Sequence, residues 1–163
     1  MTSYDILMNR CAWGNLGDPH VYIDPESLNN IARPKTNILR TAQSLVDMGK
    51  NKEAIKLMDS YFEHYPDTKL TLDIYTLPYA EVYYSAGARD KGRKIIEKLM
   101  TICSQNLDYY YSFSELHKKY FEQDIQQSLS VLKRMNMVAE KNKDPELAKR
   151  VDDLFNLKLK SFQ

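Results

Sequence analysis

The sequence has few of the residues that interrupt or crosslink a chain. Its 163 residues include five glycines, six prolines and two cysteines. So few glycines and prolines argue against a sheet with many tight turns, and they favour long helices joined by short loops. Cys11 and Cys103 lie far apart and belong to no CxxC or Cys/His cluster. This argues against a disulfide-rich scaffold and against a zinc site.

An excess of one charge is also missing, and so is any long apolar run. With 23 Lys and Arg against 22 Asp and Glu, the chain lacks the basic excess that is typical of nucleic-acid-binding domains. No window approaches the ~18 uninterrupted apolar residues of a membrane-spanning helix, and the N-terminus lacks a signal-peptide pattern. We therefore expect a soluble segment that has no transmembrane helix and binds no nucleic acid.

The first 35 residues differ from the rest of the chain. Residues 3–10 are compatible with a short helix, and the glycines and prolines that follow predict a loop. We expect this N-terminal segment, residues 1–35, to pack on the remainder, with Trp13 as its anchor. Asp18 and Asp24 are interpreted as turn initiators, because the spacing and central glycine of a calcium-binding EF-hand are absent.

From Thr36 onward the apolar residues recur at helical spacing. When the chain is aligned on Gly49 and Gly87, residues of similar size coincide. The small residues are Ala42 on Ala80 and Ala54 on Gly92, and the large residues are Leu45 on Tyr83 and Met58 on Ile96. This order resembles the tetratricopeptide repeat, a pair of antiparallel helices. The small residues mark where the two helices approach closely, and the glycines supply the left-handed residue that ends each first helix.

The pattern predicts an all-α fold of about three stacked tetratricopeptide-like pairs in a right-handed superhelix. We expect the pairs at residues 36–66, 72–107 and 114–163. The interval from Gly49 to Gly87 exceeds the roughly 34 residues of the usual repeat, and Pro78 requires its helix to start late or to kink. A helical bundle that shares these spacings is the alternative.

The third pair is degenerate and is expected to cap the stack, because an exposed end would leave apolar surface open to water. Its first helix is predicted over residues 114–141. Asp144 is expected to cap the second helix, with Pro145 at the first helical position.

Landmarks along nearly the whole chain also resemble a narrower family. They are Tyr4 to Met8, Trp13-Gly14-Asn15, Asp18-Pro19, Val21 to Asp24, Ala42 to Ala54, Leu77-Pro78, Ala80-Glu81, Tyr83-Tyr84 and Leu107 to Tyr110. Together they are similar to the C-terminal tail of a bacterial multi-pass membrane-protein family of unknown function. The N-terminal part of that family resembles protein O-mannosyltransferases, which are integral-membrane glycosyltransferases.

The resemblance implies that the chain is the soluble, non-catalytic tail of a larger protein. The catalytic residues of the parent would then lie outside this chain, and the tail would be membrane-attached on the extracytoplasmic, periplasmic side. The residues themselves leave the localisation open.

No pattern in the sequence points to catalysis or metal binding. The histidines sit at unrelated spacings, and the chain has neither a Gly-x-Ser-x-Gly elbow nor a glycine-rich phosphate loop. We therefore expect no catalytic residue, no metal and no cofactor in this segment.

The expected partner site is the concave face that the first helices of stacked pairs present. Inward positions on this pattern are Gln43 and Asp47 from the first pair, with Glu81, Tyr84 and Ser85 from the second. They sit beside the packing positions and would form a polar, mildly acidic groove with one aromatic residue. A protein or peptide is the expected partner.

The favoured hypothesis is a protein-interaction or scaffolding domain. One alternative is a structural tail that packs on the membrane part of its own parent or dimerises. Another is an acceptor- or glycan-binding accessory domain, suggested by the tyrosine-rich stretch 109–120. Packing between helices is the other interpretation of these tyrosines, and at least one of three consecutive tyrosines at 109–111 must face away from the core.

Overall fold

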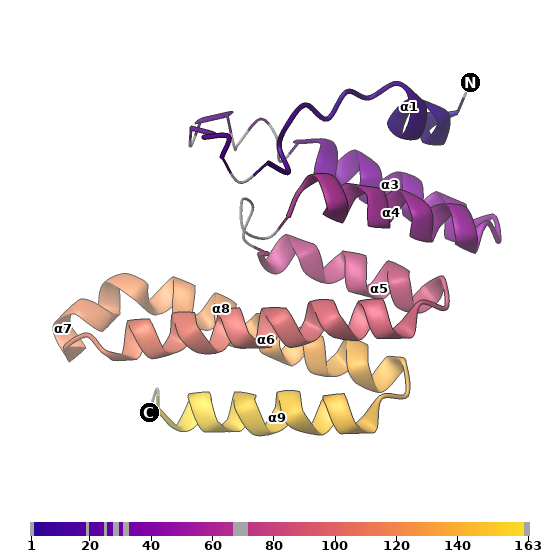
Figure 1. The fold of residues 1–163 in the computed structure, drawn as a ribbon. Helices are drawn as coiled ribbons and strands as arrows, with labels where there is room; N and C mark the ends of the chain where they lie inside the picture. Colours follow the sequence, from indigo (N-terminus) through magenta and orange to yellow (C-terminus); the bar gives the residue numbers. More distant parts are fainter. Residues whose placement is uncertain are drawn as a thin grey trace. The chain divides into compact units, whose positions relative to one another are not determined.

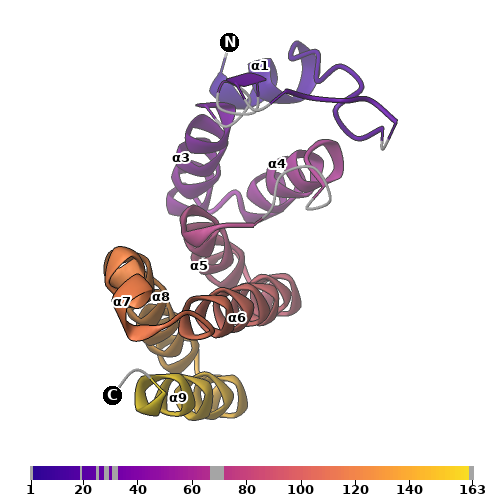
Figure 2. The ribbon, with the colours of Figure 1, turned by 90° about the vertical axis from the view of Figure 1, so that its left-hand side faces the viewer.

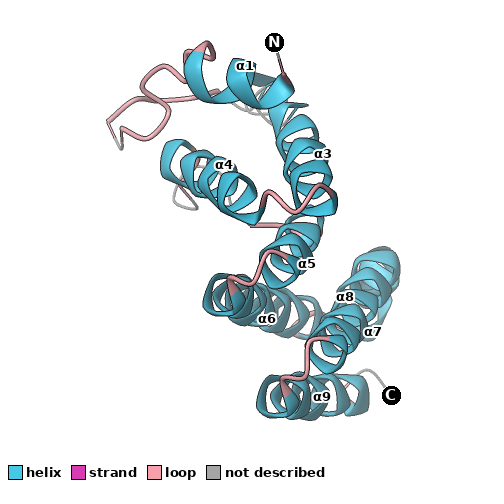
Figure 3. Cartoon of the chain, turned by 90° about the vertical axis from the view of Figure 1, so that its right-hand side faces the viewer, coloured by secondary structure: helices cyan, strands magenta, loops and turns pink. Residues whose placement is uncertain are grey.

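The computed structural model describes residues 2–18, 20–24, 26–27, 30, 33–66 and 72–161. Within these ranges the chain forms helices joined by turns and loops, without a strand (Figure 3). The expectation of an all-α fold is therefore confirmed. The chain divides into two compact units, Met1–Gly92 (unit 1) and Arg93–Gln163 (unit 2).

Unit 1 is a layered set of helices. Its elements are α1 (Ser3–Asn9), α3 (Arg33–Asp47), α4 (Asn51–His64), the 3-10 turn η1 (Ile74–Thr76), α5 (Leu77–Ser85) and the first turn of α6 (Arg89–Tyr111). α3 packs against α4 on one side and contacts α5, while α1 lies against α3 and α4 (Figure 1). The expected short helix at residues 3–10 is present.

Prolines determine where two of these helices begin. α5 starts with Leu77 and places Pro78 in its first turn, where the missing N–H costs no hydrogen bond. The expected late start is thus confirmed. α3 begins at Arg33, earlier than the predicted Thr36, because Pro34 is tolerated in a first turn for the same reason.

The turns after α3 and α5 have the same hydrogen bonds. The N–H of Gly49 donates to the carbonyl of Val46, and the N–H of Lys50 to that of Leu45, both over 2.8 Å. The same two bonds form around Gly87. This is the Schellman motif, which requires a left-handed residue. The glycines supply it, with φ of +74° at Gly49 and +85° at Gly87, as expected.

A third turn repeats the motif without a glycine. Between α8 (Glu122–Lys141) and α9 (Pro145–Lys160), the N–H of Asp144 donates to the carbonyl of Ala139 and the N–H of Lys143 to that of Glu140, over 3.0 and 2.9 Å. Lys143 takes the left-handed position, with φ of +54°. The sequence predicted a break between residue 141 and Asp144 but not this motif, because lysine gives no sign of a positive φ.

Lys143→Gly should therefore stabilise the protein by about 1 kcal/mol, because a left-handed conformation costs a residue with a Cβ about that much. Thermal denaturation should show a melting temperature higher by roughly 2–4 °C. Gly49→Ala is the matched control and should lower the melting temperature, because it adds a Cβ at a left-handed position. A Cβ there meets no atom within 4 Å, so its cost is purely conformational. A lower melting temperature for Lys143→Gly would contradict the left-handed assignment.

Several small residues are buried between the helices of unit 1. Ala42, Ala54 and Ala80 are completely buried, and Gly92 is buried at the start of α6. A Cβ added to Gly92 would come within 2.8 Å of the Tyr84 ring and 3.0 Å of the Ala80 carbonyl oxygen. The expected close crossing of Ala80 and Gly92 is therefore present, and it leaves no room for a side chain.

Aromatic rings fill much of the core of unit 1. Tyr61 stacks on Tyr65 and on Tyr79, with ring centroids 4.9 and 5.3 Å apart. Trp13 extends the series, since it meets Tyr65 edge-on at 5.5 Å and lies 5.4 Å from His64. Figure 2 shows the loop that follows α1 passing beside α4. Trp13 thus anchors the N-terminal segment, as expected.

Two of the buried tyrosines, Tyr79 and Tyr83, form hydrogen bonds through their hydroxyl groups. Tyr79 donates to the carbonyl of Lys35 over 2.5 Å. Tyr83 donates to Asp59 over 2.9 Å, and Lys91 pairs with the other oxygen of that carboxylate. Buried hydroxyls need such partners because a lost hydrogen bond in the core costs about 1–3 kcal/mol. Burial also raises the pKa of Tyr79 and Tyr83 far above the ordinary tyrosine value.

Unit 2 comprises the rest of α6, α7 (Glu115–Lys118), the 3-10 turn η2 (Lys119–Phe121), α8 and α9. The single helix predicted over residues 114–141 is wrong, because η2 separates α7 from α8. Phe121 gives the physical reason. Its ring stacks on Tyr110 and Phe113, with centroids 5.2 and 5.0 Å away, and its φ of −102° and ψ of 8° interrupt the helix.

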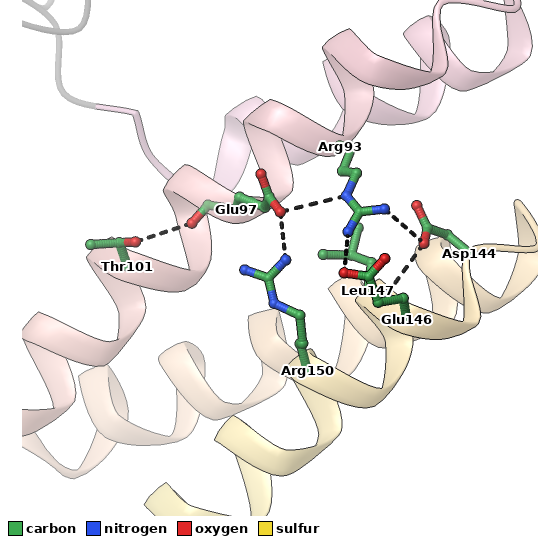
Figure 4. A network of polar contacts seen from close by, with 7 residues as sticks. All are labelled: Arg93, Glu97, Thr101, Asp144, Glu146, Leu147 and Arg150. Carbon is green, nitrogen blue, oxygen red and sulfur yellow. Dashed lines mark hydrogen bonds and ion pairs between the residues drawn. The ribbon is translucent and has the colours of Figure 1, made fainter.

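A network of charged side chains joins α6 to the start of α9 (Figure 4). Arg93 pairs with Asp144 at 3.4 Å and with Glu146 at 2.9 Å. Arg150 pairs with Glu97 at 2.6 Å. Asp144 also accepts the N–H of Leu147 over 3.3 Å, so it caps α9 as expected. Several residues of the network are partly exposed, where single ion pairs contribute about 1 kcal/mol or less.

Candidate functional site

The predicted partner residues on α3 lie at the surface. Gln43 and Asp47 are both exposed, and the Gln43 amide donates to the Asp47 carboxylate over 3.0 Å. They stand opposite the buried stripe of α3, which is formed by Ile38, Ala42 and Leu45. The structure therefore brings these two residues together, outside the core.

The predicted residues on α5 divide into an exposed and a buried part. α5 is buried on most sides, and its outward stripe consists of the exposed Ser85 and the half-buried Glu81 and Pro78. α3 contacts α5, so these polar residues lie on neighbouring helices of unit 1. Gln43, Asp47 and Ser85 are exposed, and Glu81 is half-buried.

The expectation that Tyr84 is free for a partner is wrong. Its side chain is only 9% exposed, and its ring lies against Gly92. The reason is that α5 lies between α3 and the first turn of α6, so positions beside the main packing stripe are covered as well. Tyr84 is a core residue, and the glycine at position 92 provides the space for its ring.

A groove that the sequence did not indicate runs between α1 and α3. This α1 groove has a volume of about 940 Å³, and α1, α3 and the start of α4 line it. Its apolar members include Ile6 and Leu7 of α1 and Met48 in the turn after α3, and Met48 is 65% exposed. Arg40 and Lys50 contribute positive charge. Grooves of this size are large enough for a ligand or a segment of another chain.

Sequence spacing could not reveal the α1 groove. It predicted that residues 3–10 form a helix, but not which face of the next helices that helix would cover. Met48 gave the one possible signal, as a large apolar residue just before the turn glycine. A single exposed methionine is common on protein surfaces and indicates nothing alone.

The other residues considered from the sequence have local roles. The Nδ1 atom of His64 lies 2.7 Å from the carbonyl oxygen of Ser60, within hydrogen-bonding distance. Asp18 accepts the N–H of His20 over 2.9 Å, and Asp24 accepts that of Ser27 over 2.9 Å, which confirms their role in turns. Within the described ranges, no group of three or more His, Cys, Asp or Glu side chains is placed to hold a metal ion.

The tyrosine run at the end of α6 serves mainly packing. Tyr110 stacks on Phe121, and Tyr111 donates its hydroxyl to the carbonyl of Lys158 over 3.0 Å. Tyr109 is 58% exposed, so the expectation that at least one of the three faces away from the core is confirmed. Its ring contacts Phe113 edge-on at 4.9 Å.

Comparisons with known proteins found no match to a protein-family model, to a curated protein or to a solved structure. Among the described helices, none is both long enough and apolar enough to cross a membrane. Any function must therefore be argued from the fold and the surfaces of this chain.

Proposed function

We propose that this chain is a non-catalytic protein-interaction domain built from tetratricopeptide-like helix pairs. The turn between α8 and α9 carries the proposal. It repeats, around Lys143, the pair of backbone hydrogen bonds found around Gly49 and Gly87. The unit of helix, Schellman turn and second helix thus occurs three times. Such recurrence is typical of helical repeat proteins, which present extended surfaces to their partners.

The outward residues of α3 and α5 support a partner surface in unit 1. Gln43, Asp47 and Ser85 are exposed and fill no part of the core. Polar side chains of this kind provide hydrogen bonds that orient a bound peptide, while burial of nearby apolar surface supplies the affinity. A protein or peptide is the proposed partner, on the analogy of the repeat architecture.

We also propose, from the family resemblance, that the chain is the soluble tail of a membrane glycosyltransferase-like protein on the extracytoplasmic side. The interaction domain would then recruit or orient a partner near the parent's membrane part. The genomic reading frame upstream of Met1 tests this point. Several apolar helices encoded there support it, and an immediate in-frame stop codon contradicts it.

Photo-crosslinking should locate the partner surface. A photoreactive amino acid placed at Gln43 or at Ser85 of the chain expressed in its native cells should give a discrete crosslinked product. Asp47→Lys, added to the Gln43 probe, should reduce that product several-fold by reversing the local charge. The melting temperature should hardly change, because exposed substitutions usually alter stability by less than about 0.5 kcal/mol.

Lys133 is a suitable control position, because it is exposed on α8. The same photoreactive residue there should give no product of that size. Products at all three positions alike would indicate non-specific contact. A product that contains only a second copy of the chain would contradict the proposal and favour a dimerising tail. The absence of any crosslinked product would contradict it and favour a structural tail.

A further inference from the structure

α1 is held on unit 1 without burying any of its residues. Its apolar side chains Ile6 and Leu7 face the α1 groove but stay partly exposed. The helix closes its own N-terminus, since Thr2 and Asp5 form a reciprocal capping box. This capping box does not depend on contacts with the groove, and helices with few buried contacts detach at low free-energy cost.

The α3 side of the groove is shaped to accept a helix. The groove is lined by Asn37, Thr41 and Ser44 of α3 and by Met48 directly after the helix. These residues recur every three to four positions, so they form one stripe. Thr41 and Ser44 are small, so another helix could approach the α3 backbone closely there. Met48 offers an adaptable apolar contact at one end of the stripe.

The charges of the groove favour an acidic occupant. Hydrogen bonds from Thr2, assisted by the nearby Lys50, hold the pKa of the Asp5 carboxyl below its ordinary value. Lys50 lines the same groove as this carboxylate of α1. The Arg40 guanidinium forms no ion pair or hydrogen bond with the described part of the chain. Glu53 is the one acid on the α3 and α4 side, in the first turn of α4, where the helix dipole stabilises it.

We propose that α1 is an exchangeable wall of the α1 groove, and that an acidic amphipathic helix of a partner protein replaces it against α3 and the start of α4. The apolar face of the partner helix covers Met48 and the small residues of α3. One of its carboxylates takes the place of Asp5 beside Lys50, and another pairs with Arg40. This inference rests on the proposed interaction function and gives that function a partner chemistry.

Trp13 makes the exchange reversible. Its contacts with His64 and Tyr65 lie beyond the C-terminal end of α1, so α1 stays tethered when it leaves the groove. A tethered segment returns at a high effective concentration. α1 therefore competes with the partner helix and lowers its apparent affinity.

The test uses the full chain and a fluorescent synthetic helix of about 18 residues, long enough to be helical when bound. The peptide carries Leu and Ile on one face and Glu on the other, and a matched peptide carries Lys in place of each Glu. Fluorescence anisotropy should show saturable binding of the Glu peptide only. Arg40→Glu and Lys50→Glu should each weaken binding about tenfold, through charge reversal.

Lys52→Glu is the matched control, because Lys52 is exposed on α4 and does not line the groove. It makes the same charge change and should leave binding unaltered. Equal binding of both peptides, no saturable binding, or no effect of Arg40→Glu and Lys50→Glu would overturn the proposal.

Two measurements test the exchange itself. Ile6→Ala with Leu7→Ala should tighten binding several-fold, because it weakens the competitor; weaker binding would show that α1 is part of the site. A dye on Cys11, which is exposed next to α1 while Cys103 is buried, should change its emission when the Glu peptide binds. An unchanged emission would overturn displacement. Crosslinks at Gln43 or Ser85 without peptide binding would leave the interaction function standing.

Discussion

Gly92→Leu should destabilise the protein by about 3 kcal/mol or more, the upper part of the range for overpacked cores. Even the first added carbon would overlap the Tyr84 ring and the Ala80 carbonyl oxygen. The ring can shift, but the carbonyl belongs to the backbone of α5. The better helix propensity of leucine returns less than about 1 kcal/mol. Thermal denaturation should show a melting temperature lower by roughly 6–12 °C.

Two further variants connect this effect to the crossing of α5 and α6. Lys94→Leu places the same side chain at an exposed position of α6 and should melt close to the parent protein. Tyr84→Leu combined with Gly92→Ala should cost less than the sum of the single changes, because the smaller side chain at 84 makes room for the new methyl group. A Gly92→Leu variant that melts like the parent would show that the two helices do not cross there.

Raising the pH above about 10 should unfold the protein steeply. Burial raises the pKa of Tyr61, Tyr79 and Tyr83 far above the ordinary value of 10.0. Because the folded state keeps these protons and the unfolded state releases them, stability is unaffected below pH 10 and falls above it. Each such tyrosine costs about 1.4 kcal/mol per pH unit, so the three together cost about 4.

Ultraviolet absorbance of tyrosinate and far-ultraviolet circular dichroism, recorded together during an alkaline titration, check this expectation. Any tyrosinate signal that precedes ionisation of the buried tyrosines should appear without loss of helix. Tyr61, Tyr79 and Tyr83 should ionise only as helix is lost. Tyr79→Phe should lower the slope of stability against pH by about a third. Ionisation of all tyrosines near pH 10 with the helix intact would refute the buried assignment.

The predictions that succeeded depend on local chemistry. Gly49 and Gly87 reveal a left-handed turn because glycine adopts that conformation without cost. Asp144 followed by proline reveals a helix start. In each case a single residue type reports the backbone conformation, so the helices and most of their ends could be placed from the sequence.

The predictions that failed depend on which elements become neighbours. Tyr84 was expected at the surface because its position lies beside the packing stripe, and only the approach of Gly92 from α6 shows that it is buried. The break at η2 depends on the stacking of the Phe121 ring on Tyr110 and Phe113. The α1 groove arises from where α1 docks. Periodicity within one segment carries no information about such contacts.

The position of Trp13 has a consequence for spectroscopy. It is the only tryptophan of the chain, and its ring lies against His64 and Tyr65 at the edge of the tyrosine stack. Tryptophan emission will therefore follow the release of the N-terminal segment from α4, whereas circular dichroism averages over every helix of both units. A denaturation curve recorded by emission alone would assign the stability of one anchored loop to the whole chain, and two coincident curves are needed before unfolding is treated as one transition.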